Sequence, residues 1–295
     1  MPLEALIFDV DGTLAETEEL HRQAFNEAFR AFGLDWVWPR DLYRELLGVT
    51  GGRERILHYI DHYAPAAGAG ARAKVSEMHA DKTVRYVKLI RAGDVAPRPG
   101  VRRLIAEAHD AGLRLAIATT TRPGNVEALL GAMIGREALS WFSVIAAGDI
   151  VPAKKPARDI YDYALRELGC AASACVAFED SANGVRAARQ AGLAVVATPS
   201  FFLSADDVSE SASVLSDLGE PGRPARHLAG WRFAKGYVDL AGLRSMLDEA
   251  NEIKRKTSTG GSPRADAATR RSGELNQRIE LAAARQIDFA RAAPL

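Results

Sequence analysis

Residues 3–14 read LEALIFDVDGTL, an apolar run that ends in two aspartates and a glycine. The run from Leu3 to Phe8 is short, apolar and rich in strand formers, and the acidic, glycine-containing segment after it is typical of a turn. Strands that are apolar on both faces belong to sheets with both faces covered, as parallel sheets are. This stretch therefore predicts a buried strand with Asp9 and Asp11 directly after its carboxyl end.

Four further runs of the same kind follow along the chain. They cover residues 113–119, 142–146, 174–178 and 193–197, and helix-like or loop segments separate them. This alternation is the pattern of a doubly wound parallel sheet. The expected fold class is α/β, with a Rossmann-like core.

The first two runs are roughly 100 residues apart, whereas one crossover connection takes a dozen to a few dozen residues. Within residues 16–93 apolar side chains recur at helical spacing, beginning with Leu20, Ala24, Ala28 and Phe32. Prolines and glycines from Gly93 onward mark the exit of this segment. We expect a core domain formed by residues 1–15 and 94–250, with an all-helical domain, residues 16–93, inserted into it.

The composition changes after residue 250. Residues 251–273 contain a basic cluster, a run of threonine, serine and glycine, and almost no large apolar side chain. Such a segment cannot bury enough apolar surface to fold. We expect residues 251–295 to be a disordered tail, in which residues 274–291 could form a short, weakly amphipathic helix.

Composition and charge exclude several classes of partner. The chain has 295 residues, of which 47% are hydrophobic, and its 38 basic and 38 acidic side chains cancel. A net charge of zero removes the electrostatic argument for nucleic acid or an anionic membrane. There is no apolar run of about 20 residues that could span a membrane and no secretory signal at Met1, and two cysteines give no disulfide framework. The expected protein is a cytoplasmic monomer that acts on a small molecule.

Oxygen-bearing side chains follow three of the predicted strands. They are Asp9 and Asp11, then Thr119, Thr120 and Thr121, and finally Glu179 and Asp180. The carboxyl ends of parallel strands share one edge of the sheet, where ligands bind. Crowded carboxylates repel one another unless a cation lies among them, and Mg²⁺ takes oxygen ligands together with a substrate phosphate. We therefore expect Mg²⁺ as the cofactor, with Asp9 and Asp180 as its side-chain ligands.

The remaining polar residues suit a phosphate group. Pro123 fits the first position of a helix, whose amino end would face an anion. Lys155 can supply a fixed positive charge, and the neighbouring Lys154 is the alternative. Asp9 would attack phosphorus to form an aspartyl phosphate, while Asp11 would protonate the leaving oxygen and later activate water. The residues thus predict two-step phosphoryl transfer.

Four of these segments resemble, in the same order, the four motifs of the haloacid dehalogenase superfamily of phosphatases. The segments are residues 9–14 (DVDGTL), Thr119, Lys155 with Pro156, and Glu179 with Asp180. The resemblance covers about residues 1–250 and implies a Rossmannoid core with an inserted, all-helical C1-type cap. It also implies that Asp9 is the nucleophile, Asp11 the acid and base, and Thr119 and Lys155 phosphate ligands. Mg²⁺ would lie on Asp9, the main-chain carbonyl of Asp11 and Asp180, with Glu179 as a further ligand or a support.

A closer resemblance is to the CbbY and β-phosphoglucomutase-like subfamily. It rests on residues 15–21 (AETEELH), 50–55 (TGGRER), 118–121 (ATTT) and 179–184 (EDSANG). CbbY proteins are xylulose-1,5-bisphosphate phosphatases of the Calvin cycle, so the resemblance implies that substrate. Beside Thr119, we expect Thr120 and Thr121 of the core to bind phosphate or substrate. The resemblance further implies that the substrate contacts, in the cap, Glu18, His21, Gly51, Gly52, Arg53, Glu54, Arg55 and Lys82. The two adjacent glycines fit equally a simple turn or a loop that binds a second phosphate.

The expected function is that of a Mg²⁺-dependent phosphosugar phosphatase. A phosphosugar mutase is the alternative, because it uses the same core and returns the phosphoryl group to a second hydroxyl. A non-catalytic binding module, with the basic tail docking a partner, is disfavoured because Asp9, Asp11, Lys155 and Asp180 are all present.

Overall fold

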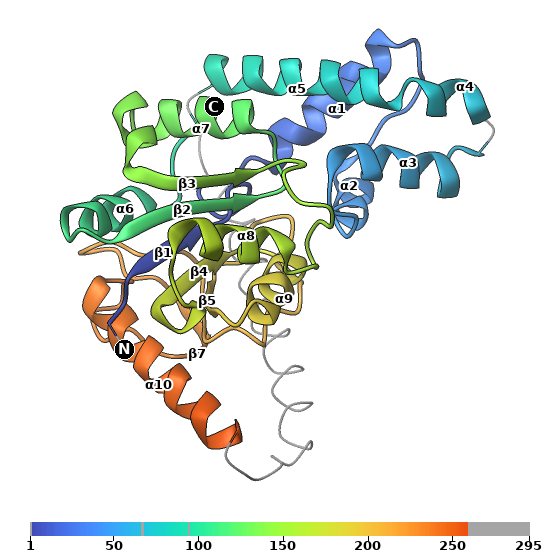
Figure 1. Ribbon diagram of the computed structural model, residues 1–295. Coiled ribbons are helices and arrows are strands. Elements are labelled where there is room, and N and C mark those ends of the chain that lie inside the picture. The colour runs from blue at the N-terminus through green and yellow to red at the C-terminus, as the bar shows by residue number, and fades with distance from the viewer. Residues whose placement is uncertain (1, 66–67, 94, 259–295) are drawn as a thin grey trace.

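The computed structural model describes residues 2–65, 68–93 and 95–258 as a sheet-based core that carries a helical cap (Figure 1). The strands are β1 (Ala5–Phe8), β2 (Arg114–Thr119), β3 (Phe142–Ala147), β4 (Cys175–Glu179), β5 (Ala194–Ala197), β6 (Ser213–Leu215) and β7 (His227–Gly230). Within the described residues they form one sheet in the order β3-β2-β1-β4-β5-β6-β7. Neighbours from β3 to β6 are parallel, and β7 is antiparallel to β6. The predicted α/β fold with a parallel sheet is confirmed.

The sheet extends beyond the five predicted strands. β6 is only three residues long, and β7 has a single buried residue among partly exposed ones. Neither segment contains a long apolar run: β6 is buried but has only three residues, and β7, the edge strand, is not buried on both faces. The pattern that identifies the inner strands is therefore missing at this edge of the sheet.

Helices cover both faces of the sheet. They are α6 (Val101–Asp110), α7 (Pro123–Met133), α8 (Asp159–Leu168), α9 (Ala182–Gln190) and α10 (Leu240–Ser258), with short 3₁₀ turns at Arg136–Trp141 and Ala172–Ala174. Leu6 and Phe8 pack in the same hydrophobic cluster as α6, α7 and α10, whereas Ala5 and Ile7 pack with α8 and α9. Successive side chains of a strand point to opposite faces, which explains why β1 is apolar throughout.

The helices between β1 and α6 form the part of the protein that we call the cap. They are α1 (Glu18–Ala31), α2 (Arg40–Leu46), α3 (Gly52–His62), α4 (Gly68–Ala73) and α5 (Val75–Ala92). Figure 1 shows α2, α3 and α4 beyond the edge of the sheet at which the arrows of β2 and β3 end, and part of α5 above α7. An aromatic cluster that includes Phe25, Phe29, Trp36, Trp38 and Tyr43 forms the cap interior, and Phe202 of the core joins it.

The last described helix, α10, continues past the expected end of the core at residue 250. Asn251 Nδ2 donates a 2.7 Å hydrogen bond to the carbonyl oxygen of Ser173, and Lys254 Nζ donates one of 2.6 Å to that of Gly192. These bonds attach the helix to the core, and residues 251–258 are helical where disorder was expected. The rest of the predicted tail, including the helix predicted over residues 274–291, lies outside the described residues. None of the described helices is both long and apolar enough to cross a bilayer.

Candidate active site

Adjacent strands bring the predicted residues to one edge of the sheet. The main-chain N–H of Asp9 donates a 3.0 Å hydrogen bond to the carbonyl of Phe178, which continues the pairing of β1 with β4. On its other side β1 pairs with β2, which ends at Thr119. Asp9 therefore lies between the strand that ends in Thr119 and the strand that leads into Asp180, as the order of the strands requires.

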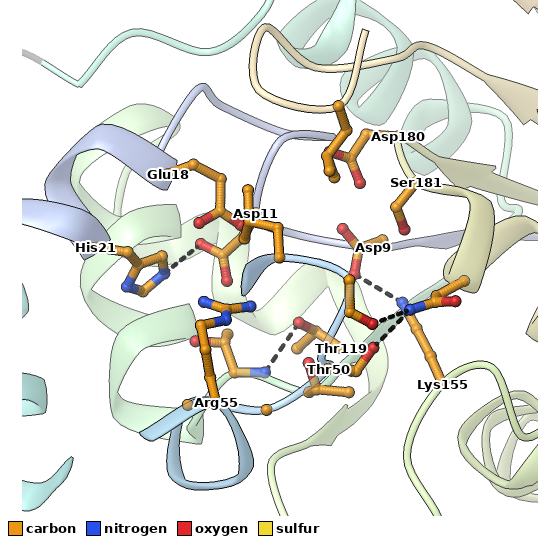
Figure 2. Close-up of a pocket in the computed structure, with 18 of the residues that line it drawn as sticks. Asp9, Asp11, Glu18, His21, Thr50, Arg55, Thr119, Lys155, Asp180 and Ser181 are labelled. Atoms are coloured by element: carbon orange, nitrogen blue, oxygen red, sulfur yellow. Dashed lines mark hydrogen bonds and ion pairs between the residues drawn. The ribbon is translucent and has the colours of Figure 1, made fainter. Parts of the chain in front are cut away.

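These residues line a cavity of about 520 Å³ between the core and the cap (Figure 2). The core contributes Asp9, Asp11, Thr119, Thr120, Thr121, Lys155 and Asp180, and the cap contributes Glu18, His21, Gly51, Gly52, Arg55 and Lys82. Glu179 lies directly behind this lining and is fully buried. The structure thus brings together most of the residues selected from the sequence.

Lys155 lies within the acidic cluster. Its Nζ is 2.7 Å from Asp9 Oδ1 and 2.6 Å from Glu179 Oε1, and its side chain is 5% exposed. Burial favours a lower pKa for this lysine, but the two carboxylates raise the pKa above its ordinary value. The alternative, Lys154, instead forms an ion pair with Glu54 of the cap. Of these two neighbouring lysines, Lys155 is therefore the one that faces the cavity.

Asp9, Glu179 and Asp180 each place a carboxylate oxygen within 4.8 Å of the others. Burial raises the pKa of Asp9 to about 8 against the opposing effect of Lys155, and burial together with Asp9 raises the pKa of Asp180. Glu179 Oε2 and Asp180 Oδ2 are buried without a hydrogen-bond partner in the described residues. Crowded carboxylates with unpartnered oxygens form a donor set that a hard divalent cation would satisfy. The residues present therefore fit a metal ion.

Two glycines permit the close approach of these carboxylates. Gly12 has a φ of +82°, in the left-handed region, and a Cβ at this position would collide with the carboxylate of Asp180. A Cβ at Gly184 would collide with the carboxylate of Glu179. Glycine is required at both positions because the carboxylates occupy the space of a side chain.

Asp11 accepts hydrogen bonds from three residues. Its Oδ1 is 2.6 Å from Thr17 Oγ1, 3.0 Å from His21 Nε2 and 3.2 Å from the Tyr86 hydroxyl. Burial favours a higher pKa for Asp11, but His21, Thr17 and Lys82 lower it below its ordinary value. This arrangement favours the ionised carboxylate and connects it to α1 and α5 of the cap.

Lys82 completes this network from α5. Its Nζ lies 2.6 Å from Nδ1 of His21 and donates a hydrogen bond to it. The imidazole then carries its proton on Nε2 and donates a hydrogen bond to Asp11. Burial lowers the pKa of Lys82 to about 7, and burial together with Lys82 lowers the pKa of His21. The imidazole stacks on the ring of Tyr86 at a centroid distance of 3.8 Å. Asp11, Lys82 and Tyr86 together therefore fix the orientation of the His21 ring.

The threonine segment forms the turn between β2 and α7. Thr119 Oγ1 accepts a 3.2 Å hydrogen bond from the main-chain N–H of Thr121, whose own Oγ1 accepts one of 3.0 Å from Asn125 Nδ2. α7 begins at Pro123, as predicted. The turn presents hydroxyl groups and the amino end of a helix to the cavity, a combination that suits an anion.

Glu18 and Arg55 face the cavity from the cap (Figure 2). A residue that the sequence did not single out joins them. The buried hydroxyl of Tyr43 donates a 2.7 Å hydrogen bond to Glu18 Oε2 and accepts one of 3.1 Å from Arg55 Nη1. Arg55 Nε also donates to the carbonyl of Leu46 at 3.0 Å. A hydrogen-bond acceptor and a cation are thereby held next to one another.

Arg53 and Glu54, which were expected to face the substrate, do not line this cavity. Both line a neighbouring groove together with Asp149 and Lys154. Successive residues of a helix point about 100° apart, so the first turn of α3 cannot direct Arg53, Glu54 and Arg55 to the same side. The expectation that the whole loop faces the cavity is therefore wrong for these two residues.

The cavity also contains side chains that were not predicted. They include Arg44, Thr50, His79, Arg122, Asn125, Asn183 and Arg186. Arg122 and Asn125 follow the threonines closely, so the predicted helix start at Pro123 was a signal that could have identified them. The others lie in helices or in a cap loop, where a polar residue is more often solvated than functional.

Comparison with known proteins agrees with this geometry. Residues 3–192 match the haloacid dehalogenase-like hydrolase family. Protein CbbY of Cereibacter sphaeroides is 51% identical over 220 residues, which cover 75% of this chain and 94% of that protein. Protein CbbY, plasmid, of Cupriavidus necator is 47% identical over 246 residues, which cover 82% of this chain and 96% of that protein.

Solved structures also show a similarity to CbbY. The crystal structure of a CbbY mutant from Rhodobacter sphaeroides in complex with xylulose-1,5-bisphosphate has a TM-score of 0.71 and 50% identity, and the match covers 75% of this chain and 96% of that one. CbbY from the same organism in complex with phosphate has a TM-score of 0.70. The chain therefore belongs to the haloacid dehalogenase-like hydrolases, in their CbbY subfamily, and is a phosphatase.

Proposed function

We propose that this phosphatase hydrolyses phosphosugars through an aspartyl phosphate on Asp9, with Mg²⁺ as cofactor and xylulose-1,5-bisphosphate as preferred substrate. The observation that carries the proposal is the buried contact of Lys155 with Asp9, 2.7 Å long, beside two further carboxylates with unpartnered oxygens. A cation next to a nucleophilic carboxylate can hold the phosphoryl oxygens while phosphorus is attacked. Relatives of about 50% identity support the choice of sugar, since one of them was solved with it.

In the first step a carboxylate oxygen of Asp9 attacks phosphorus, and the bond from phosphorus to the ester oxygen breaks. The leaving oxygen takes a proton from Asp11, which must be protonated for this step although its hydrogen bonds to Thr17 and His21 favour the ionised form. Lys155 and Thr119 hold oxygens of the phosphoryl group during the transfer. The products of this step are the free sugar hydroxyl and the aspartyl phosphate.

In the second step water attacks the phosphorus atom of the aspartyl phosphate. The bond between phosphorus and Asp9 breaks, and Asp11 takes the proton that water loses. The hydrogen bonds from Thr17 and His21 favour the ionised Asp11 that this step requires. Inorganic phosphate leaves, and both aspartates return to their starting forms.

Asp9 and Asp180 would hold Mg²⁺, with the main-chain carbonyl of Asp11 as the family resemblance implies and with Glu179 beside them. When bound, the ion would offset the negative charge of the phosphoryl group and of the clustered carboxylates. Lys155 contributes charge to the same group independently of the metal. The proposal therefore requires both the lysine and the carboxylates.

The cap would recognise the rest of the substrate. Glu18 can accept hydrogen bonds from sugar hydroxyls, and Arg55 is a cation that can bind a second phosphate. The segment at Gly51 and Gly52 also lines the cavity, so its main-chain N–H groups lie near that phosphate in the proposal. A sugar with two phosphates would therefore contact the cap residues and the core residues at the same time.

The test is phosphate release from a panel of sugar mono- and bisphosphates, with and without Mg²⁺. We expect Mg²⁺-dependent turnover that is highest for xylulose-1,5-bisphosphate, and an Asp9→Asn variant that folds normally but loses turnover. A folded Asp9→Asn protein with substantial activity would contradict the assignment of the nucleophile.

The same panel separates hydrolysis from phosphoryl transfer between two hydroxyls. With a hexose 1-phosphate and a bisphosphate activator, accumulation of the hexose 6-phosphate would identify a mutase, whereas inorganic phosphate identifies a hydrolase. That the protein is a cytoplasmic monomer, with neither nucleic acid nor membrane as partner, stays a prediction. Size-exclusion chromatography with light scattering would test the monomer.

A further inference from the structure

An ion pair joins the cap to the core beside the cavity. Lys154 Nζ lies 2.9 Å from both carboxylate oxygens of Glu54, which is 100 residues away in the sequence. Glu54 is in the first turn of the cap helix α3, and Lys154 is in the core loop between β3 and α8. The next residue of that loop is Lys155, which contacts Asp9. One short segment of the core thus contacts both the cap and the nucleophile.

A loop of the cap packs directly on this ion pair. Gly51 has a φ of +98°, and a Cβ there would lie 2.9 Å from Lys154 Nζ and would collide with the carboxylate of Glu54. Gly52 packs on the imidazole of His79, again without room for a side chain. Both glycines also line the cavity. The ion pair therefore supports the side of the loop that is remote from the cavity.

A second contact with the core holds the other end of this loop. Asn183 Nδ2 of α9 donates hydrogen bonds of 3.2 Å to the carbonyl of Gly48 and 3.1 Å to Thr50 Oγ1. Residues 48–54 are thus attached to the core before and after the two glycines. The attachment by Asn183 uses uncharged groups, whereas the attachment by Lys154 is an ion pair.

We propose that Glu54 and Lys154 are positioning residues that form a latch between the cap and the core and hold residues 50–52 over the cavity. Neither side chain needs to touch the substrate. The pair can form only when the cap lies against the core, so it stabilises the closed arrangement in which the loop and Lys155 face the same ligand. The latch acts on the same site as the proposed function. Its kinetic test therefore rests on that function, because the test uses the proposed substrate.

The kinetic test compares Glu54→Gln, Lys154→Met and the double variant. We expect each single substitution to raise the KM for xylulose-1,5-bisphosphate about threefold with little change in kcat, as for a partly exposed ion pair. The double variant should be no worse than either single one, because both remove the same interaction. Lys154→Arg keeps the charge and should recover most of the loss.

The matched control is Asp149→Asn. Asp149 lies 3.1 Å from the same Lys154 Nζ, but both residues belong to the core, so this ion pair does not join the two parts of the protein. We expect Asp149→Asn to leave KM unchanged. If Asp149→Asn raises KM as much as Glu54→Gln does, or if the two single effects simply add, the latch is refuted.

Hydrogen exchange of the substrate-free protein gives a readout that needs no sugar phosphate. In Glu54→Gln and Lys154→Met, the amides of residues 51–55 should exchange about threefold faster than in the parent protein, with no such change in Asp149→Asn. Faster exchange without any turnover of sugar phosphates would support the latch and reject the proposed function. Turnover of the sugar with unchanged exchange and unchanged KM would reject the latch alone.

Discussion

The hydroxyl of Tyr43 lies 2.7 Å from Oε2 of Glu18, and both groups are buried at the wall of the cavity. The same hydroxyl accepts a hydrogen bond from Arg55, and the ring of Phe202 packs edge-on against the phenol at 5.7 Å. One phenol therefore orients an acidic and a basic side chain that both face the ligand. It also places them relative to the core, because Phe202 belongs to the core.

A Tyr43→Phe substitution should impair the recognition of the substrate without unfolding the cap. It removes one hydroxyl and leaves Glu18 without its donor and one Arg55 N–H without its acceptor. A lost hydrogen bond to a charged group is worth about 1.5–3 kcal/mol, so we expect kcat/KM for xylulose-1,5-bisphosphate to fall by roughly tenfold or more. Steady-state kinetics would measure this change.

Tyr59→Phe is the matched control, since Tyr59 packs against Trp36 and Trp38 in the interior of the cap. We expect it to retain the kcat/KM of the parent protein. Equal losses in the two variants would mean that the cap is merely destabilised by the loss of a hydroxyl.

Lys155 should matter for stability as well as for turnover. Lys155→Met leaves Asp9 and Glu179 buried with no lysine between them, and breaking a buried ion pair in this way costs about 3–5 kcal/mol. In metal-free buffer we expect a loss of this order in the free energy of unfolding, measured with urea. Adding Glu179→Gln to Lys155→Met should recover part of the loss, because one uncompensated charge disappears. A double variant as unstable as the single one would argue against charge as the cause.

The carboxylate cluster predicts a stabilising effect of Mg²⁺. A ligand that binds only the folded state contributes about 2.7 kcal/mol at a hundredfold excess over its Kd, which for a chain of this size is roughly 5–10 °C in Tm. Asp180→Asn should reduce this increase strongly, because Asp180 is one of the proposed ligands. Calorimetry with EDTA and with added Mg²⁺ would measure both proteins. The prediction fails if Asp180→Asn responds to Mg²⁺ as the parent protein does.

The inner strands of the sheet and the central residues of the site were predictable from one sequence pattern, an apolar run that ends in polar residues. Asp9, Thr119 and Asp180 each follow an apolar run, and parallel pairing places such positions at one edge regardless of their separation in the sequence. The short strand β6 and the edge strand β7 lack that signal. Arg53 and Glu54 show another limit, because a run of similar residues does not indicate which of them faces the ligand.

Contacts between distant segments could not be read from local patterns. The pairing of Lys154 with Glu54 and the chain from Glu18 through Tyr43 to Arg55 depend on how the cap lies on the core. A tyrosine in an apolar helical pattern is interpreted as a core residue, and Tyr43 is indeed buried. Its additional role depends on where its hydroxyl lies, which helical periodicity does not specify.

The stability of the cap should depend on pH through Glu19. Its carboxylate accepts hydrogen bonds from Arg22 at 2.7 Å and from Arg40 at 3.1 Å. Burial favours a higher pKa, but the two arginines lower the pKa of Glu19 to about 2, below its ordinary value of 4.5. Because the folded state holds the ionised form, the stabilisation is complete above pH 4.5 and is lost as the pH falls towards 2.

Glu19→Gln should therefore lower the free energy of unfolding by about 1 kcal/mol at pH 7, the value typical of a partly exposed ion pair. The difference from the parent protein should shrink steadily as the pH falls below 4.5, the ordinary pKa. Asp41→Asn is the control, because Asp41 is 92% exposed beside Arg44 and its loss should change stability little at any pH. Urea titrations at several pH values would measure these differences. A gap between Glu19→Gln and the parent that stays constant down to pH 3 would show that Glu19 stabilises the cap by packing and not by its charge.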